Sequence, residues 1–145
     1  MNTKLPIVDI DHVVVRANDV AATVSFYRDA LGCEVERELD IGLVQLRAGR
    51  SLIDIVPVDS ELGRKGGDPP SVTSPRRNMD HFCLRLNPFD ETAIRAHLDK
   101  HGVTAGPVSR RYGADGFGAS IYLTDPEGNT VELKGPPESD PQLLP

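Results

Sequence analysis

The feature of this sequence that most restricts its fold is an internal repeat. Residues 10–35 read IDHVVVRANDVAATVSFYRDALGCEV, and residues 79–105 read MDHFCLRLNPFDETAIRAHLDKHGVTA. Each copy opens with Asp-His, enters a run of β-forming residues, passes a helix-start signal and reaches a glycine before another β-type run. A chain that repeats this order of signals is expected to fold as two similar modules.

Each copy predicts one helix. In the first copy, Asn18 is the expected N-cap and Gly32 the expected left-handed residue after a helix over about 19–31. In the second copy, Asn87 is the expected N-cap, a proline follows at the first helical position, and Gly102 ends the helix. The two helices therefore occupy equivalent places in the two modules.

Three β-type runs follow each helix, so each half has the order βαβββ. The predicted class is therefore α+β, with two βαβββ modules. The expected strands after the helices are residues 34–40, 43–48, 52–58, 104–112, 119–124 and 130–134.

Glycine and proline positions divide the chain. We expect one domain over residues 1–145, with a first module over about 7–58 and a second over about 79–135. The connecting loop, about 59–78, is rich in both residue types, and the tail 136–145 is rich in proline. This arrangement gives two half-size units joined by a long connection.

Composition excludes several classes of protein. The chain has 145 residues, 22 acidic and 16 basic, for a formal net charge of -6, and lacks a basic run that would follow a phosphate backbone. Nucleic acid is therefore not expected as a partner.

No apolar stretch approaches the roughly 18 residues that a membrane span needs, and the first residues lack the apolar core of a signal peptide. Cys33 and Cys83 are not in CxxC spacing and are expected as reduced thiols, so we predict a cytoplasmic protein without membrane partners.

Strand alternation places ionisable residues on one face of each sheet. Because successive side chains of a strand point to opposite faces, Phe82 and Leu84 are expected to face the helix while His81 faces away. His12 occupies the equivalent site in the first copy. In the last strand, the same alternation puts Glu132 on the face away from the helix. Buried charges of this kind must be paired or bound to a metal.

At this point the sequence resembles the vicinal oxygen chelate superfamily, which includes glyoxalase I, extradiol dioxygenases and bleomycin-binding proteins. Three motifs in the two halves of the chain carry the resemblance: IDHVVVRANDVAATVSFYRDALG at residues 10–32, MDHFCLRL at 79–86 and SIYLTDPEGNTVELKG at 120–135.

The resemblance implies that the two modules form curved mixed sheets around a metal and substrate cavity, and that the first and last strands of each half supply metal ligands. His12, His81 and Glu132 match these positions, and Asp54 is the fourth. Asp54 departs from the longer Glu or Gln of the glyoxalase I pattern, so a three-ligand site is the main expectation. The ligands come either from one chain or from two, because the resemblance also implies a homodimer.

Two histidines and a carboxylate suit one divalent ion of Fe, Mn, Ni, Co or Zn and leave positions open for substrate. By resemblance, the cation binds two neighbouring oxygens of a small-molecule substrate and stabilises the oxyanion or enediolate that forms. Glu132 and Tyr122 are the expected catalytic residues. The expected substrate-binding residues are Arg16, Arg85, Ser120 and Arg111, with substrate choice set by loops 59–78 and 110–118.

Three functions follow from the resemblance. The first is a metal-dependent glyoxalase-like lyase or isomerase acting on a small oxygen-rich substrate. The second is an extradiol-type ring-cleaving dioxygenase, although relatives of that kind usually carry a further pair of modules. The third is a metal-free protein that binds a drug or metabolite, as bleomycin-resistance proteins do. This sequence keeps the expected ligands and has only 5% aromatic residues for stacking, which favours the enzyme.

Two further features have ordinary structural explanations. His97 and His101 are spaced as a zinc-binding pair on a helix, but no nearby carboxylate completes them, and a cation in the last turn suits the helix dipole. Cys83 shares the face of His81, yet an unpaired cysteine usually packs as a small hydrophobic residue. Neither feature is expected to carry the function.

Overall fold

The computed structural model describes residues 9–68, 79 and 81–138. Of the expected connection over 59–78 and the expected tail over 136–145, residues 69–78 and 139–145 lie outside the described residues. The elements, in chain order, are β1 (His12–Ala17), α1 (Val20–Ser25), η1 (Phe26–Ala30), β2 (Val35–Glu38), β3 (Val44–Ala48), β4 (Ser51–Pro57), α2 (Glu61–Arg64), β5 (His81–Arg85), α3 (Glu91–Lys100), β6 (Ser109–Gly113), β7 (Gly116–Thr124) and β8 (Thr130–Lys134).

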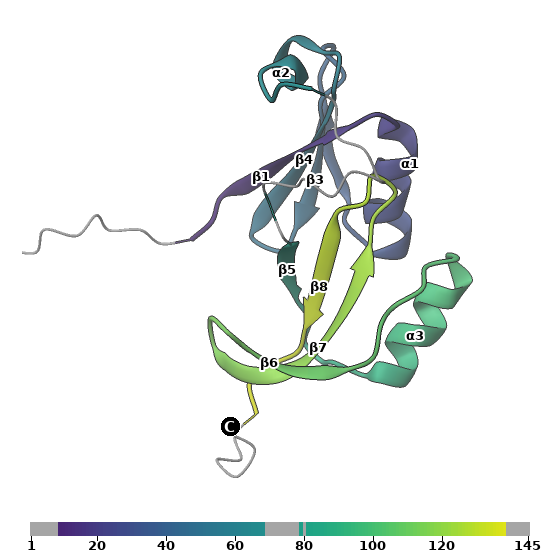
Figure 1. Ribbon diagram of the computed structural model, residues 1–145, viewed down its shortest axis with the longest axis vertical. Coiled ribbons are helices and arrows are strands. Elements are labelled where there is room, and N and C mark those ends of the chain that lie inside the picture. The colour runs from purple at the N-terminus through teal and green to yellow at the C-terminus, as the bar shows by residue number, and fades with distance from the viewer. Residues whose placement is uncertain (1–8, 69–78, 80, 139–145) are drawn as a thin grey trace, which may run out of the picture.

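The strands form two sheets of the same topology, which confirms the repeat. The first sheet has the order β1-β4-β3-β2 and the second the order β5-β8-β7-β6. In each sheet the first strand of the module pairs parallel with the last, and the remaining pairs are antiparallel. Figure 1 shows α1 beside the first sheet and α3 beside the second. The α+β class with two βαβββ modules is therefore confirmed.

The first helix starts one residue later than the sequence predicts and changes its winding. Its N-cap is Asp19, whose carboxylate accepts from the amide of Ala22, rather than Asn18. After Ser25 the helix continues as the π-helical turn η1, in which the Leu31 amide donates to the carbonyl of Phe26. Gly32 ends it with φ of 77°, as the sequence predicts.

The second helix also begins later than predicted. Asp90, not Asn87, is its N-cap, because the Asp90 carboxylate accepts from the amide of Ala93. Gly102 follows the helix with φ of 67°, as expected. In both modules the N-cap is an aspartate further along the chain than predicted. Its carboxylate accepts a hydrogen bond from the backbone amide of the third helical residue.

Two segments that the sequence assigns to loops contain regular structure. The short helix α2 lies within the expected connection, where Ser60 caps it by accepting from the amide of Gly63. The glycine-rich GADGFG segment forms the turn of the β6–β7 hairpin, where Tyr112 pairs with Phe117. No helix of the described residues is long and apolar enough to cross a membrane.

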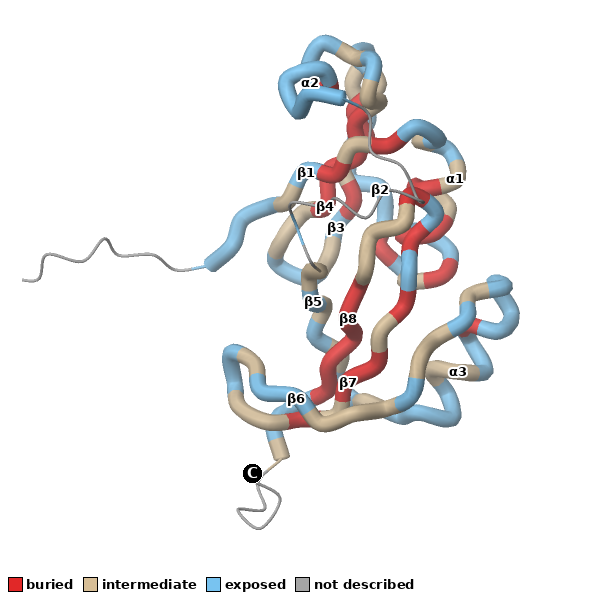
Figure 2. Tube along the Cα trace, in the orientation of Figure 1, coloured by how far each residue is buried: buried red, intermediate tan, exposed pale blue. Residues whose placement is uncertain are grey.

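One hydrophobic cluster joins the two modules. Tyr27, fully buried on η1, stacks on Phe82 of β5 with ring centroids 6.2 Å apart. Leu123, Val131 and Leu133 from the second sheet belong to the same cluster. Figure 2 shows the buried stretches running through β4, α1, β7 and β8. The apolar sides of both sheets therefore pack inward, which leaves their polar sides on the opposite faces.

Candidate functional site

The second sheet brings a histidine against a buried carboxylate. Glu132 on β8 has 6% of its surface exposed, and its Oε2 lies 3.1 Å from Nε2 of His81 on β5. The hydroxyl of Ser120 on β7 donates to Glu132 Oε1 at 2.6 Å. Three neighbouring strands thus hold one carboxylate in place, on the face that the sequence alternation predicts.

Two more side chains surround this pair. The Tyr122 ring meets the His81 ring edge-on with centroids 5.6 Å apart, and the Arg111 guanidinium lies 6.0 Å from the Tyr122 ring centroid. Burial, together with the charge of Glu132, raises the pKa of the Tyr122 phenol. Tyr122 therefore stays protonated at neutral pH and is a hydrogen-bond donor beside the carboxylate.

Cys83 lies opposite Glu132 in the β5–β8 register. Although Cys83 is exposed on one side, partial burial of its thiol, followed by the charge of Glu132, raises its pKa to about 11. The thiol is therefore protonated and unreactive at neutral pH. Its position next to the carboxylate makes it a neighbour of the candidate site rather than a nucleophile.

The first sheet carries a matching pair. His12 on β1 and Asp54 on β4 lie on the same face, because Val14, two residues after His12, pairs with Asp54 in the parallel register. The Asp11 carboxylate accepts from Nδ1 of His12 at 2.7 Å, and this hydrogen bond raises the pKa of His12. Nδ1 of His12 is thus engaged, and Nε2 is the ring nitrogen that remains for another ligand.

Asp54 is buried with one oxygen lacking a partner. It is 5% exposed, and the Gln45 amide donates to its Oδ2 at 3.1 Å. Arg37 in turn donates to the Gln45 side-chain oxygen. Asp54 Oδ1, by contrast, has no hydrogen-bond partner among the described residues. A buried carboxylate oxygen without a donor is costly, and such an atom suits a cation.

One chain does not gather the predicted ligands. Among residues 9–68, 79 and 81–138, no group of three or more His, Cys, Asp or Glu side chains is placed to hold a metal ion. The chain instead offers two separate pairs, His12 with Asp54 and His81 with Glu132, one on the polar face of each sheet.

The expected substrate-binding arginines have different surroundings. Arg16 donates to the backbone carbonyls of Gly63, Gly67 and Asp68, so it ties the segment after α2 to β1. The exposed Arg85 forms an ion pair with Asp115 at 3.2 Å, on the face that carries His81. Arg16 thus has a structural partner, whereas Arg85 remains on the polar face of the second sheet.

The DPEG segment does more than form a turn. Asp125 is buried and accepts from the Tyr27 hydroxyl at 2.7 Å, while the Glu127 carboxylate accepts from the amide of Asn18. Burial raises the pKa of Tyr27 far above its usual range, and the charge of Asp125 adds to the effect. These contacts fasten the second module to the helix of the first.

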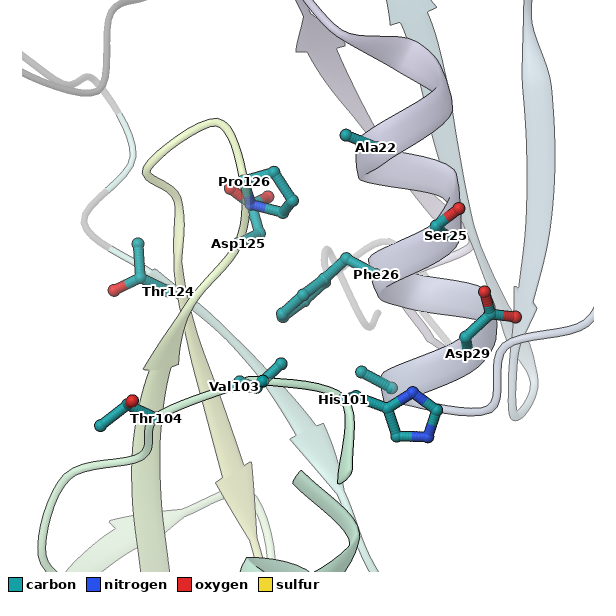
Figure 3. A pocket seen from close by; sticks show the side chains of 12 residues that line it. Ala22, Ser25, Phe26, Asp29, His101, Val103, Thr104, Thr124, Asp125 and Pro126 are labelled. Atoms are coloured by element: carbon teal, nitrogen blue, oxygen red, sulfur yellow. The ribbon is translucent and has the colours of Figure 1, made fainter. Parts of the chain in front are cut away.

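A separate cleft of about 710 Å³ lies beside α1 and η1. Figure 3 shows the Phe26 ring pointing from the helix toward the side of Asp125 and Pro126, with His101 at one end. None of the four predicted metal ligands lines this cleft. His97, whose ring lies 4.8 Å from that of His101, contacts the Ala30 carbonyl through Nε2 at 2.8 Å, which gives it a packing role.

Sequence reasoning missed three residues on the polar faces. Gln45 holds Asp54, Asp115 pairs with Arg85, and Lys134 lies buried two residues after Glu132. Alternation alone indicates the face of Lys134 and Gln45, but only strand pairing brings Gln45 opposite Asp54. Asp115 belongs to a hairpin that the sequence assigned to a loop.

Comparison with known proteins finds relatives across most of the chain. The glyoxalase domain-containing protein RDO1 of Mycosarcoma maydis is 30% identical over 133 residues, which are 90% of this chain and 69% of RDO1. The crystal structure of virulence protein STM3117 from Salmonella typhimurium matches with a TM-score of 0.74 at 23% identity, covering 91% of this chain and 99% of that one. Lactoylglutathione lyase from Agrobacterium tumefaciens matches with a TM-score of 0.65 at 26% identity, over 90% of this chain and 95% of the lyase.

These matches agree with the fold of two βαβββ modules. The family model of the Glyoxalase/Bleomycin resistance protein/Dioxygenase superfamily matches residues 9–133. The match spans both modules, including all four residues predicted as metal ligands. The chain therefore belongs to the Glyoxalase/Bleomycin resistance protein/Dioxygenase superfamily.

Proposed function

We propose that this protein is a divalent-metal-dependent enzyme, a glyoxalase-like lyase or isomerase that binds a small substrate through neighbouring oxygens. The observation that carries the proposal is the contact between His81 Nε2 and the buried Glu132 carboxylate, 3.1 Å apart and held by Ser120. An imidazole and a carboxylate aligned in this way form half of a metal site. The superfamily includes lyases, transferases and dioxygenases, so the reaction class is an inference from the site.

The other half of the site is His12 with Asp54 of a second copy of the chain. Each copy has both pairs, and the single chain leaves them apart among its described residues. A symmetric dimer that lays the first sheet of one copy against the second sheet of the other would join them twice. Two observations on the described residues support this arrangement: Asp54 Oδ1 lacks a hydrogen-bond partner, and Asp11 binds Nδ1 of His12, so that Nε2 remains as its other ring nitrogen.

The donor set fits the proposed ion. Two imidazoles and carboxylate oxygens suit Fe, Mn, Ni, Co or Zn, with coordination positions left for substrate oxygens. When bound, the cation would supply Lewis-acid chemistry at those oxygens. Hydrogen bonds from neighbouring side chains already orient three of the proposed ligands. Asp11 contacts His12, Gln45 contacts Asp54, and Ser120 contacts Glu132.

Glu132 and Tyr122 are the proposed catalytic residues. The Ser120 hydroxyl occupies Oε1 of Glu132, so Oε2 is the oxygen left to hold the ion or, where substrate oxygens take its place on the ion, to accept a proton from a substrate carbon. The Tyr122 phenol, kept protonated by its raised pKa, would donate a hydrogen bond to a substrate oxygen. The low exposure of Glu132 keeps water away from the transferred proton.

The first test is the metal content of protein purified without added metal, measured by elemental mass spectrometry. We expect about one divalent ion per chain. His81→Ala and Glu132→Gln should each lose it, while the control His97→Ala, whose histidine contacts the Ala30 carbonyl, should keep it. Protein that takes up none of the five metals on titration would contradict the proposal and favour the metal-free binding protein.

A complementation experiment tests whether two chains share the site. His12→Ala and His81→Ala are each expected to bind no metal. After unfolding and refolding together, each mixed dimer would combine an intact His81 from one chain with an intact His12 from the other and so recover one site. If the mixture binds no more than the separate variants, the ligands come from a single chain.

The metal-loaded protein is then assayed with thiol adducts of dicarbonyls and with catechols. Turnover of the first class supports the lyase or isomerase, and ring cleavage of the second supports a dioxygenase.

We further propose a cytoplasmic location, because both cysteines, Cys33 and Cys83, are free thiols in the structure.

A further inference from the structure

A buried lysine lies on the polar face of the second sheet. Lys134 on β8 is 8% exposed, and its Nζ donates to the Gly116 carbonyl at 2.9 Å. Among the hydrogen bonds and ion pairs of the described residues, it has no carboxylate partner. A buried ammonium that forms a hydrogen bond to a carbonyl but no ion pair among the described residues is costly, and an anion from outside the chain would stabilise it.

The β6–β7 hairpin is shaped around this lysine. A Cβ on Gly113 would lie 2.8 Å from Lys134 Cε, and one on Gly118 would lie 3.0 Å from Nζ. Both glycines therefore leave space that the lysine side chain fills. The glycines of the GADGFG segment thus serve a specific purpose, since they allow Lys134 to lie across β7 toward the hairpin turn.

Arg85 lies opposite Lys134 on the neighbouring strand, and Asp115 precedes Gly116, whose carbonyl Lys134 contacts. Arg85 pairs with Lys134 in the β5–β8 register, so both side chains share one face, and the Asp115 carboxylate lies 3.2 Å from Arg85 Nε. Both members of this ion pair are exposed, with side chains 60% and 49% accessible, so the pair is weak and easily exchanged. Asp115 therefore occupies the place that an external carboxylate would take.

The charge of this face is opposite to that of the whole chain. Arg85, Arg111 and Lys134 lie on it with the two carboxylates Glu132 and Asp115, which leaves an excess of one positive charge, whereas the chain carries a net charge of -6. Cations concentrated in this way attract small anions to one place on the molecule.

We propose that Lys134 and Arg85 form an anion subsite, and that the substrate carries a carboxylate or similar anionic group besides its chelating oxygens. The substrate anion displaces Asp115 from Arg85 and is bound by the arginine and by Lys134. Glu132 and Lys134 are alternate residues of one strand, so their Cα atoms are about 6 to 7 Å apart. The anionic group therefore lies a few bonds from the oxygens held at His81 and Glu132, an assignment that rests on the proposed metal site.

The test compares two ligands of Ni²⁺-loaded protein by calorimetry. α-Ketoglutarate and α-ketovalerate present the same vicinal oxygens, but only the first has a second carboxylate in place of a methyl group. We expect α-ketoglutarate to bind about ten to a hundred times more tightly, as for a charge-assisted hydrogen bond. Equal affinities for the two ligands would overturn the proposal.

Three variants locate the subsite. Lys134→Met and Arg85→Gln should each reduce the preference for α-ketoglutarate, whereas Asp115→Asn should increase it by removing the internal competitor. Lys100→Met, which removes the same charge from the exposed end of α3, should leave the preference unchanged. An unchanged preference in Lys134→Met, or a loss in Asp115→Asn, would contradict the proposal. Since Arg85 and Asp115 are exposed, their variants remain informative if Lys134→Met does not fold.

A parallel measurement separates this subsite from the proposed metal site. Metal-free protein is titrated with glutarate while the backbone amide signals of residues 113–118 are followed by NMR. Shifts that saturate in the wild type and disappear in Lys134→Met support the subsite even if Ni²⁺ does not bind. Uptake of Ni²⁺ without any glutarate-dependent shift would support the metal site and overturn the anion subsite.

Discussion

At the scale of single residues, the chemistry of Glu132 depends on the side chains that neighbouring strands bring to it. His81 comes from β5 and Ser120 from β7, and both contact the carboxylate directly. The same negative charge acts on two nearby acids, because it contributes to the raised pKa values of Cys83 and Tyr122. The polar groups around Glu132 are therefore kept as donors.

The reactivity of Cys83 tests this electrostatic effect. Its pKa, raised from 9.0 to about 11, lowers the thiolate fraction at pH 8, so alkylation by iodoacetamide should be about a hundredfold slower than for an ordinary exposed thiol. The rate is measured by mass spectrometry on metal-free Cys33→Ala protein. Glu132→Gln should restore part of the rate, because burial, the larger cause, remains. An ordinary rate in the parent protein would contradict this explanation.

At the scale of elements, the turn between β7 and β8 holds the modules together. Asp125 accepts from the hydroxyl of Tyr27 and also from the amides of Glu127 and Asn129. The π-helical turn η1 positions Tyr27 so that its ring stacks on Phe82 while its hydroxyl reaches this turn. The TDPEGN motif thus attaches the second module to the helical segment of the first through the hydrogen bond between Tyr27 and Asp125.

Tyr27→Phe should destabilise the chain at neutral pH by about 1 to 3 kcal/mol, because it leaves a buried carboxylate with one donor fewer. The pKa of Tyr27 is higher in the folded chain than in the unfolded one, so this stabilisation is complete below about pH 10 and is lost as the pH rises above it. The free energy of unfolding in urea is measured for both proteins at neutral pH and above about pH 10. The wild type should lose stability on the alkaline side more steeply than the variant, and parallel losses would contradict the prediction.

At the scale of the whole molecule, the two pairs of candidate ligands occupy equivalent positions on different sheets, because Asp54 and Glu132 each pair with the residue two places after the histidine of their module. His12 and His81 both begin the first strand of a module, and Asp54 and Glu132 both lie in the last. The repeat therefore creates two half-sites in each chain, and a second copy is the simplest way to complete both.

Metal retention should consequently depend on protein concentration. On dilution, metal bound per chain should fall together with the dimer fraction, because each separated chain keeps only two ligands of a site. Equilibrium dialysis measures the metal, and sedimentation velocity measures the dimer on the same samples. Monomers that keep their full metal content would show that one chain suffices.

The sequence by itself determined the repeat, the βαβββ order, the helix-ending glycines Gly32 and Gly102, and the face on which His81 and Glu132 lie. These features depend on local conformational preference and on the two-residue period of a strand, which neighbouring residues encode. The caps at Asp19 and Asp90 were missed because several adjacent polar residues can cap a helix, and the packing of the helix selects one.

Only the tertiary structure decided which residues meet across strands. Strand register determines three such contacts: His81 with Glu132, Gln45 with Asp54, and Lys134 with the Gly116 carbonyl. Register is set by long-range pairing and by core packing between segments far apart in the chain. For the same reason, alternation predicted the face of each candidate ligand but not which pairs of ligands one chain brings together.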